Sequence, residues 1–313
     1  MQRIYRKIIA LISTLFIISI VTFAVFHVIP GDPAMQILGT EASPERLELL
    51  RKQLGIDKSL PKQYITWVQG IAKGDFGESI KYRKPVRDII VDRIPVTVAL
   101  SSMSIILIFI ISIPISVYSC KKEYTLLDEC INVLTVFSVS VPGFFMGILF
   151  VWVFGLLLRA FIPGAYISYQ ENFMEFLKYL FFPALVIAIP NSAVVIKYLR
   201  SSIQNEMKLD YVRTAFSKGY SENAVLFRHV LKNALVPLIS LLGMIVGDVF
   251  SGSIIIEQVF NVPGIGKLLI AAITARDYPL IQTLVVIIAC IVVFSNTLAD
   301  IILQIIDPRI RIE

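Results

Sequence analysis

The stretch "DYVRTAFSKGYSENAVLFRHVLKNALVP", residues 210–237, carries four basic residues and a histidine, yet it lies between two strongly apolar parts of the chain. Asp210 is expected to cap a short helix that ends near Lys218, and Gly219 is expected to stop that helix. Ser221 is expected to cap a second helix, with an acidic residue next to it at the positive end. The pattern predicts two short helices joined at a glycine.

Each predicted helix has an apolar side. In the first, this side comprises Tyr211, Val212, Ala215 and Phe216. In the second, apolar residues recur at intervals of four and three, at Tyr220, Ala224, Phe227, Leu231 and Ala234. Such a segment is either a docking surface for another protein or an amphipathic hairpin on the lipid headgroups, which its basic residues favour. The residue pattern alone leaves both interpretations open.

The composition indicates a membrane protein, because 56% of the 313 residues are apolar, 17% are charged and the mean hydropathy is +0.77. Six segments reach the length of about 20 apolar residues that a helix needs to cross a bilayer. They are Ile8–Ile29, Pro95–Ser119, Ile131–Leu158, Leu180–Leu199, Val236–Ile256 and Leu280–Ile306. The sequence therefore predicts an all-α membrane protein with six transmembrane helices.

Charge sets the predicted orientation, because short cytoplasmic loops are enriched in Lys and Arg. With the N-terminus inside, thirteen cations lie in the cytoplasm, whereas the two short outer loops carry four. Both termini are thus expected to be cytoplasmic. The predicted parts are an N-terminal transmembrane helix (1–29), an extracytoplasmic segment (30–94) and a five-helix core (95–313), which includes a cytoplasmic loop at 200–235.

The extracytoplasmic segment is expected to be a small helical cap packed on the membrane domain. Ser43 is a candidate N-cap, Pro44 suits the first helical position, and Gly55 suits the end of that helix. A second helix is expected from Pro61 to Ala72. Some 65 residues form a marginal core on their own, so we expect this segment to depend on the membrane domain.

Catalytic and metal-binding motifs are missing from the sequence, so we expect neither enzyme activity nor a cofactor nor a metal in this chain. The stretch "NVPGIGKLL" resembles a phosphate-binding loop, but it has Asn261 where Gly is required and Leu268 where Ser or Thr is required. The three cysteines form no metal-ligand pattern. His27 and His229 are too far apart in sequence and topology to suggest a shared metal ion.

Polar residues inside the apolar segments are candidates for a translocation pathway, because they are costly in a membrane. The alternative is that they bond to neighbouring helices. The candidates are Asn191, Asp248, Asn296 and Asp300, with Ser138 and Ser140 beside a predicted break at Pro142 and Gly143.

Several motifs in order resemble the permease subunits of ATP-binding-cassette importers, in the branch that carries dipeptides, oligopeptides and nickel. "YVRTAFSKG" followed by "RHVLKNALVP" resembles the EAA loop of these permeases. The other similar stretches are "RIPVTVALS", "SVSVPGFF", "IIIEQVFNVPGIGKLL", "ARDYPLIQ" and "DPRIR".

The resemblance implies that the opening stretch holds a coupling helix, which docks in a groove of a separate ATPase subunit. The residues concerned are Tyr211, Val212, Arg213, Thr214, Ala215, Phe216, Ser217, Lys218, Gly219, Tyr220 and Ser221. It also implies an outer reentrant turn at Glu257, Pro263, Gly264 and Gly266, where the glycines are expected to adopt backbone conformations closed to other residues and to shape an outer gate.

The resemblance further implies a non-catalytic permease in a bacterial or archaeal cytoplasmic membrane, forming half of a pathway for oligopeptides or dipeptides. The expected partners are a second homologous permease, two ATPase subunits that use ATP and Mg²⁺, an extracytoplasmic substrate-binding protein and membrane lipid, but no nucleic acid. Nickel, a metal chelate or an oligosaccharide are alternative cargoes. A secondary transporter or channel is the alternative from a different class, and it would need an ion site or filter.

Overall fold

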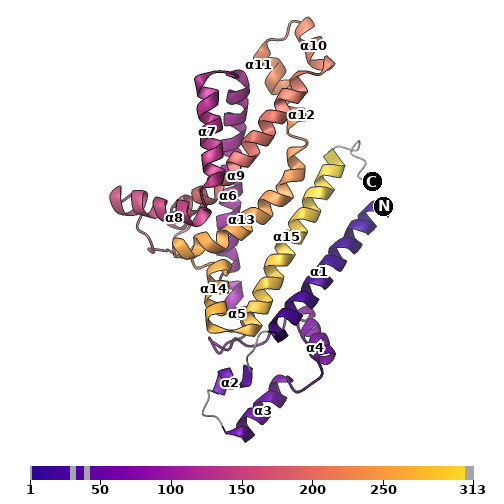
Figure 1. Cartoon of the computed structure of the whole chain (residues 1–313), viewed down its shortest axis with the longest axis vertical. Coiled ribbons are helices and arrows are strands. Elements are labelled where there is room, and N and C mark those ends of the chain that lie inside the picture. The colour runs from indigo at the N-terminus through magenta and orange to yellow at the C-terminus, as the bar shows by residue number, and fades with distance from the viewer. Residues whose placement is uncertain (1, 29–32, 39–42, 307–313) are drawn as a thin grey trace. The chain divides into compact units, whose positions relative to one another are not determined.

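The computed structural model describes residues 2–28, 33–38 and 43–306, whose helices are shown in Figure 1. Among these residues all regular structure is helical, apart from one isolated β-bridge between Glu78 and Pro85. The chain divides into two compact units, Met1–Val96 with Pro263–Val293 and Thr97–Val262 with Phe294–Glu313. The predicted boundary at residue 29 and the terminal "DPRIR" lie outside the described residues.

The first unit contains the N-terminal helix and a set of short helices. They are α1 (Gln2–Val28), α2 (Pro33–Leu38), α3 (Pro44–Leu54), α4 (Leu60–Ala72), α5 (Val86–Val91), α14 (Ile265–Ala275) and the first part of α15 (Tyr278–Ile306). Helix α4 packs on α1, where the hydroxyls of Ser19 and Tyr64 lie 2.8 Å apart. The Phe23 ring also lies 5.4 Å from that of Tyr64 and 5.9 Å from that of Trp67. The short helix α4 therefore has an aromatic contact with α1.

The ends of α3 follow the prediction in part. Pro44 is the first helical residue, and Gly55 ends the helix with a left-handed backbone (φ 68°), as expected for a C-terminal glycine. Ser43 does occupy the N-cap position, but its side chain makes no capping hydrogen bond. The serine therefore marks the start of the helix without providing the expected bond.

The second unit is arranged around the longest helix. Its helices are most of α6 (Ile94–Lys121), α7 (Leu126–Ser140), α8 (Gly143–Phe150), the π-helical segment η1 (Val151–Leu157), α9 (Phe173–Met207), α10 (Asp210–Ser217), α11 (Glu222–Val225), the π-helical turn η2 (Leu226–Val230), α12 (Leu231–Ala234) and α13 (Leu238–Val259). Helix α9 packs against α7, α8, α12 and α13. It is therefore the element on which the rest of this unit assembles.

Helices α6 and α9 contact each other in a parallel register. The Ser116 hydroxyl lies 3.4 Å from the Ile196 carbonyl, and the Cys120 thiol lies 3.7 Å from the Arg200 carbonyl. Both contacts join residues 80 positions apart. Small side chains of α6 thus contact backbone carbonyls of α9, a kind of contact that helices commonly make in membranes.

Four of the described helical stretches are long and apolar enough to cross a membrane: Val86–Lys121, Phe173–Met207, Leu238–Val259 and Tyr278–Ile302. A fifth is obtained if α7 and the α8–η1 stretch count as one span. The described apolar part of α1 covers Ile9–Val25, which is shorter than the usual length of a span. The chain is thus a helical multi-pass membrane protein, and the count of six spans stays a prediction.

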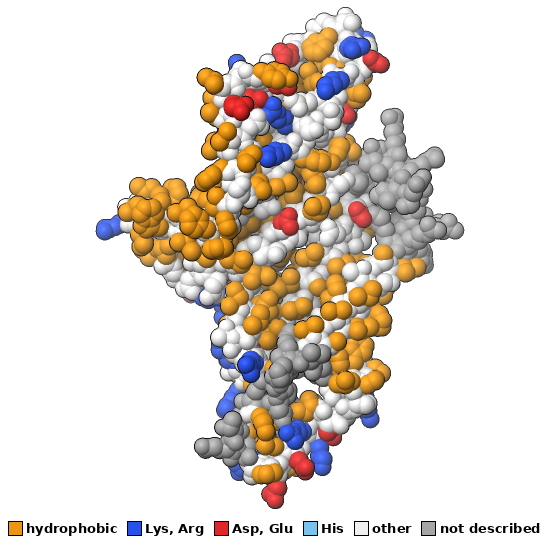
Figure 2. Space-filling model, viewed as in Figure 1, with side chains coloured by type: hydrophobic (Ala, Val, Ile, Leu, Met, Phe, Trp, Pro, Cys, Tyr) orange, Lys and Arg blue, Asp and Glu red, His pale blue; other side chains and the backbone are white. Residues whose placement is uncertain are grey.

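The predicted third span, Ile131–Leu158, is interrupted where the sequence indicated a break, at Pro142 and Gly143. It bends by 104° between Ser140 and Gly143. Proline has no backbone N–H and forces the residue before it out of the helical conformation, and Val141 accordingly has an extended backbone (φ −82°, ψ 123°). Beyond the bend, α8 and η1 expose apolar side chains, among them Phe144, Phe145, Ile148 and Trp152. Figure 2 shows hydrophobic side chains gathered where α8 projects in Figure 1.

Candidate functional site

The segment between α9 and α13 folds as a helical hairpin (residues 210–234), in which α10 forms one arm and α11, η2 and α12 form the other. The expected cap at Asp210 is wrong. Leu209 occupies the N-cap position, and Asp210 is the first residue of the helix. Its carboxylate still lies at the positive end of α10, and it pairs with Arg213 at 3.6 Å on the exposed surface.

The turn between the two arms depends on Gly219, which has φ +84°. The Gly219 amide donates to the Phe216 carbonyl at 2.9 Å, and the Tyr220 amide donates to the Ala215 carbonyl at 3.3 Å. These bonds end α10 as a left-handed glycine typically does. A Cβ atom at this position would meet nothing within 4 Å, so the backbone angle and not crowding favours glycine.

The second arm begins as predicted, because the Ser221 hydroxyl accepts a hydrogen bond from the Ala224 amide at 3.4 Å. Its predicted apolar stripe is wrong in large part. Tyr220 and Phe227 are exposed, and the buried residues are Val225, Leu226, Val230 and Ala234. The physical reason is that this arm has apolar residues on two faces, and α6 and α9 cover the face that carries Val225, Leu226 and Val230.

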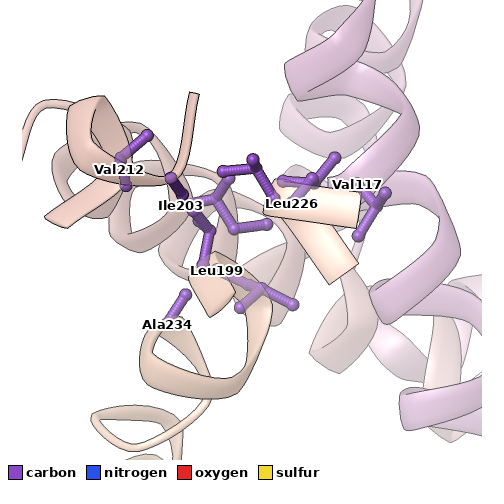
Figure 3. Close-up of a cluster of buried hydrophobic side chains, with 9 residues drawn as sticks. Val117, Leu199, Ile203, Val212, Leu226 and Ala234 are labelled. Carbon is purple, nitrogen blue, oxygen red and sulfur yellow. The ribbon is translucent and has the colours of Figure 1, made fainter. Parts of the chain in front are cut away.

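A cluster of buried apolar side chains anchors the hairpin (Figure 3). It joins both arms to the end of α9 and to α6. Its members are Val117, Leu199, Ile203, Val212, Ala215, Val225, Leu226, Val230 and Ala234. Val212 is 1% exposed, so the inner face of α10 is covered by the chain itself. The hairpin is therefore packed directly on the end of α9.

Polar contacts add to this anchor. The Tyr211 hydroxyl donates to the Glu206 carboxylate at 2.5 Å. Burial, together with this bond, raises the pKa of Tyr211 to about 12, so the phenol remains a donor at neutral pH. The Ser202 hydroxyl donates to the Ala234 carbonyl at 3.0 Å, and the Lys121 ammonium donates to the Asn223 side chain at 2.5 Å.

The opposite surface of the hairpin exposes aromatic and basic side chains. Phe216 is 42% exposed, Tyr220 43% and Phe227 54%. The Lys121 ammonium lies 4.9 Å above the Phe227 ring, and the Tyr220 ring packs edge-on against His229 at 5.6 Å. Basic residues are exposed around them: Arg213, Lys218, Arg228 and Lys232. Hydrophobic and basic side chains lie side by side at the top of Figure 2. Such a mixture suits a protein interface.

A buried ion pair lies near the same end of α9. The Arg200 guanidinium donates to Asp128 at 2.8 Å and to the Asn132 side chain at 2.9 Å. The Ser119 hydroxyl donates to the other Asp128 oxygen at 2.5 Å. This network joins α6, α7 and α9. The sequence did not indicate it, because a pair of residues 72 positions apart has no local signature.

Three of the predicted pathway residues, Ser138, Ser140 and Asn191, form hydrogen bonds within their own helices. The hydroxyls of Ser138 and Ser140 bond to their own helix, at the carbonyls of Leu134 and Val136. The Asn191 amide likewise donates to the Ile187 carbonyl at 2.9 Å. On α13 and α15, the predicted residues Asp248, Asn296 and Asp300 are exposed. A role for any of them in a pathway stays a prediction.

Glu257 is fully buried near the end of α13 and accepts a hydrogen bond from the Thr97 hydroxyl at 2.6 Å. Close to it, the Tyr179 hydroxyl donates to the Phe260 carbonyl at 2.5 Å and accepts from the Gly164 amide at 3.2 Å. These bonds fix the turn that follows α13 within the second unit. Tyr179 was missed, because a tyrosine in an apolar span has no distinctive spacing.

The expected reason for the glycines in the following turn is wrong. Gly264 has φ −98°, which any residue adopts, and Gly266 lies inside α14. The residue with a left-handed backbone is Asn261, at φ 59°. Within the first unit, the Arg93 guanidinium donates to the Pro263 carbonyl at 3.2 Å. Both glycines are buried.

Another group that the sequence did not single out is Asp277, which is fully buried before α15. Its carboxylate accepts hydrogen bonds from the Ser79 hydroxyl and from the amides of Ile80 at 3.2 Å, Lys81 at 3.1 Å and Leu280 at 3.4 Å. One side chain therefore caps α15 and holds the 79–81 loop. An acidic residue just before a helix with an early proline is a signal that could have indicated the cap.

Metal ligands are not clustered in the described part of the chain, where no group of three His, Cys, Asp or Glu side chains could hold an ion. The three cysteines are free. The side chain of His27 lies outside the described residues, so the structure does not test its predicted separation from His229.

The sequence matches the family described as binding-protein-dependent transport system inner membrane component over residues 110–312, and the N-terminal region of such components over residues 1–101. It is 35% identical to the oligopeptide transport system permease protein AppB of Bacillus subtilis, 32% identical to a probable peptide ABC transporter permease of Sinorhizobium fredii and 34% identical to a putative peptide transport system permease of Brucella abortus. Each alignment covers 98% of this chain and 98% of the relative.

Proposed function

The chain belongs to the family of binding-protein-dependent transport system inner membrane components, and on this premise we propose that it is the permease subunit of an ATP-driven peptide importer. The three relatives named above have peptide or oligopeptide in their names, which favours these cargoes over nickel, a metal chelate or an oligosaccharide. Membership of a binding-protein-dependent system argues against a secondary transporter or a channel. The permease is non-catalytic.

The proposed orientation places both termini and the helical hairpin in the cytoplasm and residues 30–94 outside. The excess of cations in the loops on one side supports this arrangement. The proposed assembly contains a second homologous permease, two ATPase subunits that hold ATP and Mg²⁺, and a substrate-binding protein on the outer face. In such an assembly this chain forms half of the pathway. Asp248 is a candidate for its wall, because an exposed carboxylate on a membrane helix needs water or a polar partner.

One observation carries the coupling role: the hairpin is anchored on its inner face and exposes aromatic and basic side chains on its outer face. A hairpin that rests on lipid would direct its main apolar face outwards. Here that face, with Val212, Leu226 and Val230, is covered by α6 and α9. The exposed residues around Phe216 and Tyr220 are then available to a groove on the ATPase subunit, and the rigid contact with α9 passes the movement on.

The test uses the complete complex with Gly219→Val. Because φ is +84°, a β-branched residue strains the turn by roughly 1–3 kcal/mol. We expect the variant to insert and to pair with the second permease, but to recover less ATPase subunit on purification and to lose substrate-stimulated ATP hydrolysis. Co-purification and hydrolysis rates measure the two effects.

Gly219→Asn is the matched control, because asparagine tolerates the left-handed conformation and the site has room for its side chain. Phe216→Ala tests the surface without altering the turn, and we expect it to weaken ATPase recruitment as well. Normal recruitment and normal stimulation in both Gly219→Val and Phe216→Ala would refute the coupling role.

A further inference from the structure

The loop between α4 and α5, residues 77–85, is held at its base by the buried carboxylate of Asp277. This carboxylate accepts hydrogen bonds from the Ser79 hydroxyl and from two backbone amides of the loop, at 3.1 and 3.2 Å. The loop is also closed on itself, because the Ser79 amide donates to the Lys84 carbonyl at 3.0 Å and the Arg83 amide donates to the Ser79 carbonyl at 2.9 Å. We call it the anchored loop, and its backbone is fixed by groups of the first unit alone.

The tip of the anchored loop is exposed and strongly basic. Residues 79–87 contain four cations and no acidic residue. The acidic residues on either side, Glu78 and Asp88, are exposed and form no ion pair with these cations in the described part of the chain. Arg276, which directly precedes the Asp277 anchor, is a further exposed cation. We call these residues the basic patch: Lys81, Arg83, Lys84, Arg87 and Arg276.

Two arginines of the basic patch have backbone angles that do not suit arginine. Arg83 has φ 50° and Arg276 has φ 53°. This left-handed conformation favours glycine, which is also the common residue at a helix end such as that of α14, where Arg276 is the cap. Neither guanidinium group makes a hydrogen bond or an ion pair with another described residue. The fold therefore does not explain the two arginines, and residues held in such conformations cluster at functional sites.

The side chains of the anchored loop are of the types found in protein interfaces. Tyr82 is 39% exposed, and the Lys81 ammonium lies 5.2 Å from the centre of its ring. Arginine and tyrosine are enriched in protein interfaces and among their strongest contacts. A loop whose backbone is already fixed loses little entropy on binding. A segment that rests on lipid needs a wide apolar face instead, and Tyr82 is the one aromatic residue in the exposed run 81–85.

We propose that the basic patch binds an acidic face of the substrate-binding protein. This inference rests on the proposed function, which places residues 30–94 and such a protein on the outer side of the membrane. Asp or Glu carboxylates of the partner would accept paired hydrogen bonds from the guanidinium groups of Arg83 and Arg276. Ion pairs at an exposed interface are screened by salt, so the affinity should decrease as sodium chloride is added.

The experiment measures how tightly the complete complex, in nanodiscs of phosphatidylcholine, binds its fluorescently labelled substrate-binding protein. Arg83→Gly and Arg276→Gly each remove a cation and introduce the residue that suits the backbone, so the unfolding temperature should be unchanged or higher. We expect the affinity to fall about two- to fivefold in each variant, because one exposed ion pair contributes about that factor. The double variant should lose about tenfold, and the loss should shrink at high salt.

Two controls separate the role of the patch from a general effect of charge. Arg83→Lys keeps the cation and should retain most of the affinity. Lys62→Gln removes one exposed cation on α4, in the same unit, and should leave the affinity unchanged. An equal loss in Lys62→Gln would overturn the proposal. A loss that appears only in nanodiscs containing phosphatidylglycerol would assign the patch to lipid and would overturn it as well.

The readouts distinguish this inference from the proposed function. Recovery of the ATPase subunits tests the coupling role of the hairpin, whereas affinity for the substrate-binding protein tests the basic patch. Unchanged affinity in the double variant, in a complex whose parent form recovers its ATPase subunits and binds the substrate-binding protein, would overturn this inference alone. A parent complex that does not bind the substrate-binding protein at all would overturn both.

Discussion

At the scale of single residues, Arg200 forms a largely buried ion pair with Asp128 in the second unit. Its side chain is 17% exposed and that of Asp128 is 6% exposed, so both charges are largely removed from water. Two further hydrogen bonds surround the pair: the Ser119 hydroxyl donates to Asp128 at 2.5 Å, and Arg200 donates to the Asn132 side chain at 2.9 Å. Such an ion pair contributes little to folding stability compared with apolar residues of similar size. Removing one of the two charges is strongly destabilising, because the other charge then stays buried without a partner.

We therefore predict that Arg200→Met destabilises the purified chain by about 3–5 kcal/mol, because the Asp128 carboxylate remains buried without its cation. Thermal unfolding in detergent, followed by a thiol-reactive dye, measures the change. The double variant Arg200→Met with Asp128→Asn should recover most of the loss. If the double variant is as unstable as Arg200→Met alone, the cost does not come from the unpaired charge.

At the scale of elements, Asp277 connects the start of α15 with the 79–81 loop. Its Ala variant removes the acceptor for the amides of Ile80, Lys81 and Leu280. Hydrogen bonds to a charged group contribute about 1.5–3 kcal/mol each, so we predict that these amides exchange at least tenfold faster in Asp277→Ala. Hydrogen exchange measured by mass spectrometry on peptides that cover residues 77–86 and 277–284 tests this.

Asp75→Ala is the matched control, since that carboxylate is exposed and accepts one recorded bond, from the Gly77 amide at 3.0 Å. Exchange in the 277–284 peptide should be unchanged in this variant. If Asp277→Ala behaves like Asp75→Ala, the buried carboxylate does not hold the two elements together.

The helix ends and the buried helix faces show how much of the fold could be predicted from the sequence. Helix ends with local signals were found: Gly219 and Gly55 take the left-handed backbone, and Ser221 caps its helix. These features depend on a few neighbouring residues. The buried face of the second arm was not found, because apolar residues occur on two of its faces and contacts with α6 and α9, which are distant in the chain, decide which face is buried.

Other misses have a non-local origin. The 104° bend follows from Pro142, which the sequence indicated as a break but not as a change of direction. The Asp128–Arg200 pair and the Tyr179 bonds to the turn after α13 join residues far apart in the chain. The candidate site was located from one contiguous segment, whereas the surfaces that anchor it come from α6 and α9.

At the scale of the whole molecule, the number of spans and their orientation depend on the N-terminal helix. Its described apolar part is short, and if it does not cross the membrane, residues 43–94 lie on the same side as the N-terminus. The distribution of charge argues that it does cross, because thirteen cations then face the cytoplasm. Single-residue labelling decides between the two arrangements.

We predict that a cysteine at Lys58, in a chain whose three native cysteines are replaced by Ala, reacts with a membrane-impermeant maleimide added from outside intact cells. Lys58 is exposed, so accessibility does not limit the reaction. Lys122→Cys, in the exposed turn between α6 and α7, should react only after the membrane is permeabilised. The proposed fold places these two positions on opposite sides of the membrane, so it predicts that only the cysteine at position 58 is labelled in intact cells. Labelling of Lys122→Cys alone from outside would reverse the topology and would move the helical hairpin to the face where no ATPase subunit can reach it.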